Sequence, residues 1–189
     1  LVGALRLQLG TVYFFAGVAK LNSDWLFRAE PLRTWLLSFT EVPVVGKIFT
    51  YKLTAFVFSW AGAMYDLAMP FLLSFKRTLP FAYVAVVGFH VVTWLMFPIG
   101  MFPWVMIVLT WVFFPISFHE RLVSAMESLL PTRTHQQKTR LWKPKTVKPL
   151  ALFFVLFFLF QLIFPFRYLA YPGNVLWTEQ GFRFSWRVM

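Results

Sequence analysis

A lysine at the end of a long apolar run is the first candidate for chemistry in this sequence. Lys20 follows the apolar stretch 1–19 and precedes the polar run 22–24. A lysine at the edge of a membrane span usually lays its stem in lipid and keeps its ammonium in water. Folded back into a dry pocket, the same side chain loses hydration, which favours the neutral amine and makes it a usable base. Position alone leaves both interpretations open.

A histidine in a second apolar run is the next candidate. His90 lies among apolar neighbours in the segment 79–97, and Trp94 follows one helical turn later. A lone histidine in such surroundings is often a core residue with a hydrogen-bond partner, but ionisable residues inside membranes tend to mark functional sites. On one helix face, His90 and Trp94 would line a pocket for a flat aromatic ligand. Both the structural and the functional interpretation stay open.

Two oppositely charged residues lie deep inside apolar segments. Arg6 lies about 13 residues inward from the Lys20 end of the first segment, and Asp66 about 12 residues inward in the second, so at ~1.5 Å per residue they reach similar depths. Charges inside a membrane are costly unless they are paired. We therefore predict a structural ion pair between Arg6 and Asp66.

The composition determines which elements must position these residues. Of the 189 residues, 59% are hydrophobic, 21% are aromatic and only 13% are charged. Several stretches approach the ~20 apolar residues that one bilayer crossing needs. The expected fold is all-α: a polytopic transmembrane helical bundle, integral to the membrane and in contact with its lipid.

Hydropathy and length predict about five spans in a transmembrane domain over residues 1–170. The linker 20–53 mixes apolar and charged residues, which is typical of an amphipathic helix lying in the membrane interface. Residues 171–189 are expected to begin an extramembrane domain on the outer or lumenal side. The predicted spans are about 1–19, 54–75, 79–97, 99–118 and 149–170.

A basic segment orients the predicted bundle. Basic residues outnumber the acidic Glu120 and Glu127 between 119 and 148, which predicts a cytoplasmic loop there. Lys20 and the turn at 97–100 then lie toward the outer or lumenal face. The net charge of +11 does not require nucleic acid as a partner, because cations beside spans bind anionic lipid headgroups. The basic residues of this loop are Arg121, Arg133, Lys138, Arg140, Lys143, Lys145 and Lys148.

Several kinds of chemistry find no support in the sequence. There is no cysteine, so disulfides, thiolate metal sites and a cysteine nucleophile are excluded. The other histidines, His119 and His135, lie far from His90 and beside no carboxylate cluster, so no metal is expected. No phosphate-binding loop or serine nucleophile motif occurs. The chain begins at Leu1 inside an apolar run, and we expect it to be an internal piece of a longer protein.

Four separated segments form a pattern that covers nearly the whole chain, although each motif alone is short. The segments are Leu5-Arg6-Leu7-Gln8-Leu9 through Lys20 to Trp25, Tyr65-Asp66-Leu67, Phe89-His90 with Phe97-Pro98-Ile99-Gly100-Met101-Phe102, and the tail with Trp177-Thr178 and Phe184-Ser185-Trp186. Together they resemble the vitamin K-dependent gamma-carboxylase branch of the horizontally transferred transmembrane-domain (HTTM) proteins. The first segment, which holds Lys20, resembles the catalytic-lysine region of that family, and the others follow in the family's order.

The resemblance implies a membrane enzyme that oxidises reduced vitamin K, the hydroquinone, with O2 to its epoxide. The alkoxide formed on the way removes a γ-hydrogen from glutamate in a protein or peptide substrate, and the carbanion captures CO2. Lys20 matches the base that deprotonates the hydroquinone, and His90 matches a histidine near the quinone. The residues that we predict to contact the cofactor are Trp25, Trp94, Met101 and Phe102. No metal is implied.

Some departures keep alternatives open. Eukaryotic members of the family have two adjacent lysines where this chain has Ala19 and Lys20. A family member that binds or oxidises a quinone or lipid without carboxylating protein is one alternative, and a non-catalytic membrane scaffold is another, because fold does not dictate function. A scaffold predicts Lys20 among the headgroups. An enzyme predicts Lys20 and His90 facing one apolar, aromatic-lined cavity. Asp24 pairs with Lys20, faces the interface or caps the next short helix.

Overall fold

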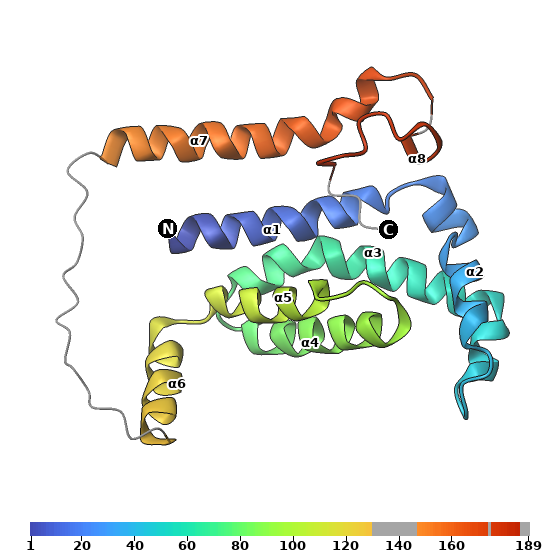
Figure 1. Cartoon of the computed structure of the whole chain (residues 1–189), viewed down its shortest axis with the longest axis horizontal. Helices are drawn as coiled ribbons and strands as arrows, with labels where there is room; N and C mark the ends of the chain where they lie inside the picture. Colours follow the sequence, from blue (N-terminus) through green and yellow to red (C-terminus); the bar gives the residue numbers. More distant parts are fainter. Residues whose placement is uncertain (130–146, 174, 186–189) are drawn as a thin grey trace.

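The computed structural model describes residues 1–129, 147–173 and 175–185. Every regular element in these residues is a helix and none is a β-strand, which confirms the predicted all-α class. Helices suit so apolar a chain because each satisfies its own backbone hydrogen bonds. Figure 1 shows helices α1, α3, α4 and α5 lying side by side, with α7 running along α1.

Four helices in the described residues are long and apolar enough to cross a membrane. Helix α1 spans Val2–Ala19, α3 spans Lys52–Ser74 and α4 spans Leu79–Met96. The fourth is α7, Val147–Ile163, which continues as the 3-10 helix η5, Phe164–Ala170. These bounds agree with four of the predicted spans to within a few residues.

The predicted span 99–118 is shorter than expected. After the turn at Gly100 (φ 62°), α5 covers Phe102–Leu109 and the 3-10 helix η4 covers Thr110–Phe113. Phe114 is extended, because the residue before a proline avoids the helical conformation, and Pro115 has no N–H to donate. Helix α6, Ile116–Leu129, then departs at 116°. The bundle has a fifth span only if this bent pair counts as one.

Helices α1 and α3 pack closely because of a glycine. A Cβ placed on Gly17 would lie 2.7 Å from Cγ of Leu67 and 2.9 Å from its backbone nitrogen. The buried core extends from this pair to α4 and α5, with the side chains of Leu9, Met69, Val86 and Met106 among its members. The close contact sets the register between α1 and α3, and so decides which polar residues of the two helices meet.

The linker between α1 and α3 is a chain of short helices. It contains η1 (Asp24–Arg28), α2 (Leu32–Leu36), η2 (Leu37–Phe39) and η3 (Gly46–Thr50). Leu32 and Leu36 are buried while Arg33 is exposed, so α2 is amphipathic as expected, although it is only 5 residues long. This linker covers one end of the bundle (Figure 1).

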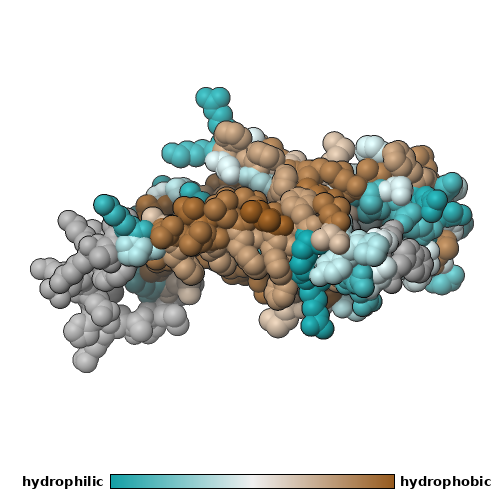
Figure 2. Space-filling view, turned by 90° about the horizontal axis from the view of Figure 1, so that it is seen from above, coloured by the Kyte–Doolittle hydropathy of each residue, from teal (hydrophilic) through white to brown (hydrophobic). Residues whose placement is uncertain are grey.

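The C-terminal part packs less tightly. Most described residues of α7 have exposed or half-buried side chains, and Phe166 of η5 contacts Phe15 of α1 at a ring-centroid distance of 5.4 Å. Figure 2 shows apolar side chains over the middle of the molecule in this view and hydrophilic ones mostly toward its ends and edges. The tail includes α8, Val175–Thr178. In the predicted basic loop 119–148, residues up to Leu129 belong to α6, and residues 130–146 lie outside the described part of the chain.

Candidate active site

A cavity of about 640 Å³ lies where the linker meets α1, α3, α4 and α5. Its walls are mostly apolar and rich in aromatic rings. Four titratable side chains reach it, and they form two pairs, each joining α1 to another helix. Lys20 of α1 pairs with Asp66 of α3, and Tyr13 of α1 bonds to His90 of α4. Lys20 and His90 therefore face one aromatic-lined cavity.

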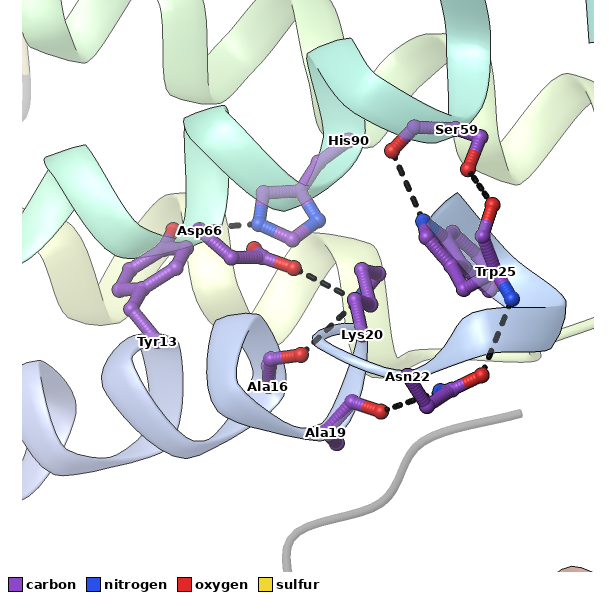
Figure 3. Close-up of polar contacts among 9 residues, drawn as sticks. All are labelled: Tyr13, Ala16, Ala19, Lys20, Asn22, Trp25, Ser59, Asp66 and His90. Carbon is purple, nitrogen blue, oxygen red and sulfur yellow. Dashed lines mark hydrogen bonds and ion pairs between the residues drawn. The ribbon is translucent and has the colours of Figure 1, made fainter. Parts of the chain in front are cut away.

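Lys20 folds back along its own helix. It is the C-cap of α1, and its Nζ lies 2.6 Å from Oδ2 of Asp66 and 3.3 Å from the carbonyl oxygen of Ala16 (Figure 3). The side chains of Lys20 and Asp66 are only 15% and 6% exposed. The Nζ also lies 5.3 Å from the centre of the Trp25 ring. The ammonium thus points into the cavity, which is the geometry that the enzyme interpretation predicts.

The predicted ion pair between Arg6 and Asp66 is wrong. Arg6 donates instead to backbone carbonyls at the end of η4, with Nε 2.8 Å from the oxygen of Val112 and Nη2 3.4 Å from that of Phe113. These carbonyls lack helical partners because Pro115 ends the helix. The contact between Gly17 and Leu67 places Asp66 level with Lys20, so counting residues from the span ends misjudged its depth.

Only one member of the second pair, Tyr13 and His90, was predicted from the sequence. Oη of Tyr13 lies 3.1 Å from Nε2 of His90, and the two residues are 2% and 3% exposed. Sequence reasoning selected His90 and missed Tyr13. A signal was present, because Tyr13 precedes Lys20 by two helical turns and so lies on the same face of α1.

The predicted cofactor contacts divide into two groups. Trp25 and Phe102 line the cavity, whereas Trp94 and Met101 do not. Trp94 packs against Trp104 at a ring-centroid distance of 5.3 Å and is 45% exposed. The cavity side of α4 carries Phe89, His90, Thr93 and Met96.

Helix geometry explains why Trp94 lies outside the cavity wall that it was predicted to line. At about 100° per residue, Thr93 lies on one side of His90 around the helix axis and Trp94 on the other. The cavity lies on the Thr93 side, so Trp94 turns outward. Met101, next to the positive-φ Gly100 in the turn, is 76% exposed.

Hydrogen bonds hold Trp25 in the cavity wall. Its Nε1 donates to the carbonyl oxygen of Ser59 at 2.8 Å, and the Ser59 hydroxyl donates to the carbonyl of Trp25 (Figure 3). The backbone nitrogen of Trp25 donates to Oδ1 of Asn22 at 3.0 Å. Ser59, buried in α3, was not recognised from the sequence. Asp24 pairs with Arg28 at 3.1 Å rather than with Lys20.

A bundle of membrane-length helices enclosing an apolar cavity with a buried lysine–aspartate pair defines a membrane protein with an internal polar site. Residues 1–118 match the HTTM domain, so this chain belongs to the HTTM family. Residues 146–189, which include α7, match the lumenal domain of vitamin K-dependent gamma-carboxylase. The two matches identify a carboxylase-like membrane protein of the gamma-carboxylase family. No solved structure matches the chain. Among the described residues, no group of His, Cys, Asp or Glu is arranged to hold a metal ion.

Proposed function

We propose that this protein oxidises reduced vitamin K with O2 to the epoxide and couples that reaction to the carboxylation of glutamate in a protein substrate. The observation that carries the proposal is that Lys20 and His90 line the same cavity. The family resemblance assigns the base to Lys20 and a position near the quinone to His90. Both matches to family domains agree with this reaction class.

The cavity suits a fused-ring hydroquinone. Its volume of about 640 Å³ lies within the usual range for small-molecule pockets. The rings of Trp25, Trp35, Phe89 and Phe102 supply flat apolar walls, while polar groups are few. Such walls exclude water, which would quench a strong base formed inside. An apolar ligand would reach this site from the bilayer.

Each polar pair has a distinct role in the proposal. The hydroxyl proton of the hydroquinone passes to the Lys20–Asp66 pair, which joins α1 to α3 inside the cavity. Tyr13 fixes the His90 ring through the bond between Oη and Nε2, so the histidine is held ready to hydrogen-bond to an oxygen of the bound ring. The bound hydroquinone and O2 supply the energy and the basicity that remove the γ-hydrogen of glutamate before CO2 adds.

We also propose that the chain crosses the membrane several times, with the site toward the outer or lumenal face. The turn between α3 and α4, which carries Lys76 and Arg77, lies at the opposite end of the bundle from α2, and so does α6 (Figure 1). Basic residues favour the cytoplasmic side. The partners are then membrane lipid and a glutamate-bearing protein or peptide that approaches from the outer side.

The test measures epoxide and carboxylation together. The protein, expressed at its natural length in nanodiscs, receives vitamin K hydroquinone, O2, labelled CO2 and a glutamate peptide. We expect epoxide and labelled peptide from the wild type, neither from Lys20→Ala, and wild-type amounts from the control Lys47→Ala, which removes an exposed lysine outside the cavity.

The other outcomes identify the alternatives. Epoxide without labelled peptide would indicate a quinone-oxidising family member that does not carboxylate protein. A well-folded wild-type protein that forms no epoxide would contradict the proposed enzyme and favour a scaffold.

A further inference from the structure

We propose that α6 lies flat in the cytoplasmic leaflet of the bilayer, with its apolar side among the acyl chains and its polar side in water. The lipid contact is independent of the proposed reaction, and only the choice of leaflet uses the orientation proposed above. The amphipathic pattern of α6, its direction, its depth and the side that it turns toward the bundle together support this placement.

Helix α6, Ile116–Leu129, separates its apolar and polar side chains. At about 100° per residue, the polar and charged residues fall within about one third of its circumference. Apolar residues occupy the other side, and His119 is the one polar residue among them. Such a helix suits a position where one side meets an apolar medium and the other meets water. The residues of the polar side are Ser117, Glu120, Arg121, Ser124, Glu127 and Ser128.

Much of the apolar side of α6 is uncovered. The residues Ile116, Val123 and Met126 are 75%, 52% and 55% exposed. A contiguous exposed apolar surface marks contact with another apolar medium, which is either lipid or protein. Four further observations favour lipid.

The direction of α6 suits a helix in the plane of the membrane. It departs at 116° from the segment formed by α5 and η4, after Pro115 has ended that segment. Helix α5 lies beside the membrane-length helices α1, α3 and α4 (Figure 1). A helix at this angle to them runs more nearly along the bilayer than across it.

Contacts with α4 place the start of α6 at the depth of the membrane interface. Nε1 of Trp111 donates to Oη of Tyr83 in α4, and the rings of Tyr83 and Phe114 are 5.2 Å apart. Tyr83 lies four residues, about 6 Å at ~1.5 Å per residue, inward from the end of α4 at Leu79. Amphipathic helices bury their apolar side about 5–10 Å into the boundary between headgroups and acyl chains. Pro115 therefore releases α6 at the depth where such helices bind.

The contacts of Phe118 show which side of α6 faces the bilayer. Its ring lies 4.5 Å from that of Phe114 and 6.2 Å from that of Trp111, and both of these residues precede α6 at the end of the bundle. The apolar side of α6 is thus turned back toward the bundle and the hydrocarbon around it. The opposite side, which carries Glu120 and Glu127, is turned away toward water.

Basic residues at the same end of the bundle match the charge of lipid headgroups. Lys76 and Arg77, in the turn between α3 and α4, are exposed, and so is Lys148 near the start of α7. Figure 1 shows that this turn, α6 and the start of α7 lie at one end. Anionic lipid supplies both the acyl chains that cover the apolar side of α6 and the negative charges that attract these cations. One partner therefore accounts for both surfaces.

The test attaches the environment-sensitive fluorophore NBD to single cysteines, because residues 1–189 contain none. The protein at its natural length, with any other cysteine replaced by serine, is placed in nanodiscs of phosphatidylcholine and phosphatidylglycerol. Val123→Cys and Met126→Cys report on the apolar side, and Ser117→Cys and Ser124→Cys are their matched controls on the polar side. Gly88→Cys marks the deep hydrocarbon, because it lies near the middle of α4 and its Cβ would meet nothing within 4 Å.

Nitroxide lipids and aqueous iodide then measure the depth of each label. We expect a nitroxide near the headgroup to quench the two apolar-side labels about threefold more than one near the chain end, with the order reversed for Gly88→Cys. We expect iodide to quench the two polar-side labels about threefold more than the apolar-side labels. All four labels on α6 replace exposed side chains, so the fold should tolerate them.

Three results would overturn the inference. Quenching of the α6 labels by the deep nitroxide to the extent seen for Gly88→Cys would mean that α6 crosses the bilayer. Equal quenching of all four labels by iodide would mean that α6 lies in water. Apolar-side labels shielded from both quenchers would mean that protein covers this side of α6.

A second measurement tests the leaflet. We expect a membrane-impermeant maleimide to modify Ser124→Cys in inverted membrane vesicles and not in intact cells. Modification in intact cells would overturn the choice of leaflet together with the proposed orientation. Neither measurement depends on epoxide formation, so failure of the proposed reaction would be recognised separately.

Discussion

The two ends of α1 each carry a basic side chain, and the protein accommodates them differently. Near the first end, Arg6 donates to carbonyl oxygens of η4, and its Nε lies 2.8 Å from the oxygen of Val112. Its guanidinium thus supplies hydrogen bonds to carbonyls that lack partners where the helix ends. At the other end, Lys20 meets the carboxylate of Asp66 inside a cavity. One cation thus serves the fold, while the other lies where a ligand can reach it.

The difference shows that depth alone does not distinguish a structural charge from a functional one. Arg6 is half-buried and Lys20 lies closer to the edge of its helix, yet Lys20 lines the cavity. What separates them is the partner. Neutral carbonyls satisfy a planar guanidinium without taking up its proton, whereas an ammonium and a carboxylate form a unit whose proton count can change.

The largest effect on stability is expected when one member of the Lys20–Asp66 pair is replaced. Lys20→Met leaves Asp66 as a buried carboxylate without a cation, which should lower the free energy of unfolding by about 3–5 kcal/mol. Lys20→Met combined with Asp66→Leu removes both charges and should cost less than either single change. Unfolding in detergent, measured as a double-mutant cycle, gives the comparison. Additive losses would contradict a coupled pair.

Close packing of α1 on α3 is the next feature to disturb. Gly17→Ala adds a Cβ 2.7 Å from Leu67 Cγ, so the helices must separate, at a cost of about 1–3 kcal/mol. Because the same contact places Asp66 beside Lys20, we expect epoxide formation to fall as well. Gly10→Ala is the matched control on α1, since its Cβ would meet Pro70 at an ordinary 3.7 Å. Equal effects of the two changes would show that Gly17 does not set the register.

Hydropathy and length were enough to locate most membrane-length helices, because crossing a bilayer requires long apolar runs. They were not enough for the span 99–118, where Pro115 turns the chain away, although the proline is visible in the sequence. There, one proline ended the helix although the mean hydropathy of the segment predicted a continuous span.

Within the candidate site, individual residues were easier to select than their partners. Lys20, His90 and Asp66 stand out as polar side chains in apolar surroundings. Their pairing depends on the register between helices, which span boundaries do not reveal and which the close contact between Gly17 and Leu67 helps to set. Tyr13 and Ser59 were missed because neither residue type is unusual in a membrane helix.

The Arg6 end provides a smaller test. Arg6→Lys keeps the charge but replaces the guanidinium fork, so the carbonyls of Val112 and Phe113 cannot both keep their present bonds. We expect a loss of about 1 kcal/mol in the free energy of unfolding and no change in epoxide formation per folded molecule. A fall in epoxide formation at unchanged stability would contradict the structural role given to Arg6.

The smallest effect is expected at an ion pair that resembles the Lys20 pair only in its charges. Asp24 and Arg28 lie four residues apart, 3.1 Å between charged atoms, with side chains 31% and 74% exposed. Solvent screens such a pair, so Arg28→Ala should change the free energy of unfolding by less than about 0.5 kcal/mol and leave epoxide formation intact. The same unfolding measurement tests this change beside Lys20→Met. A loss comparable to that of Lys20→Met would mean that burial does not explain the contribution of the Lys20–Asp66 pair to the free energy of unfolding. It would also mean that the linker after α1 stabilises the site through charge as well as through packing.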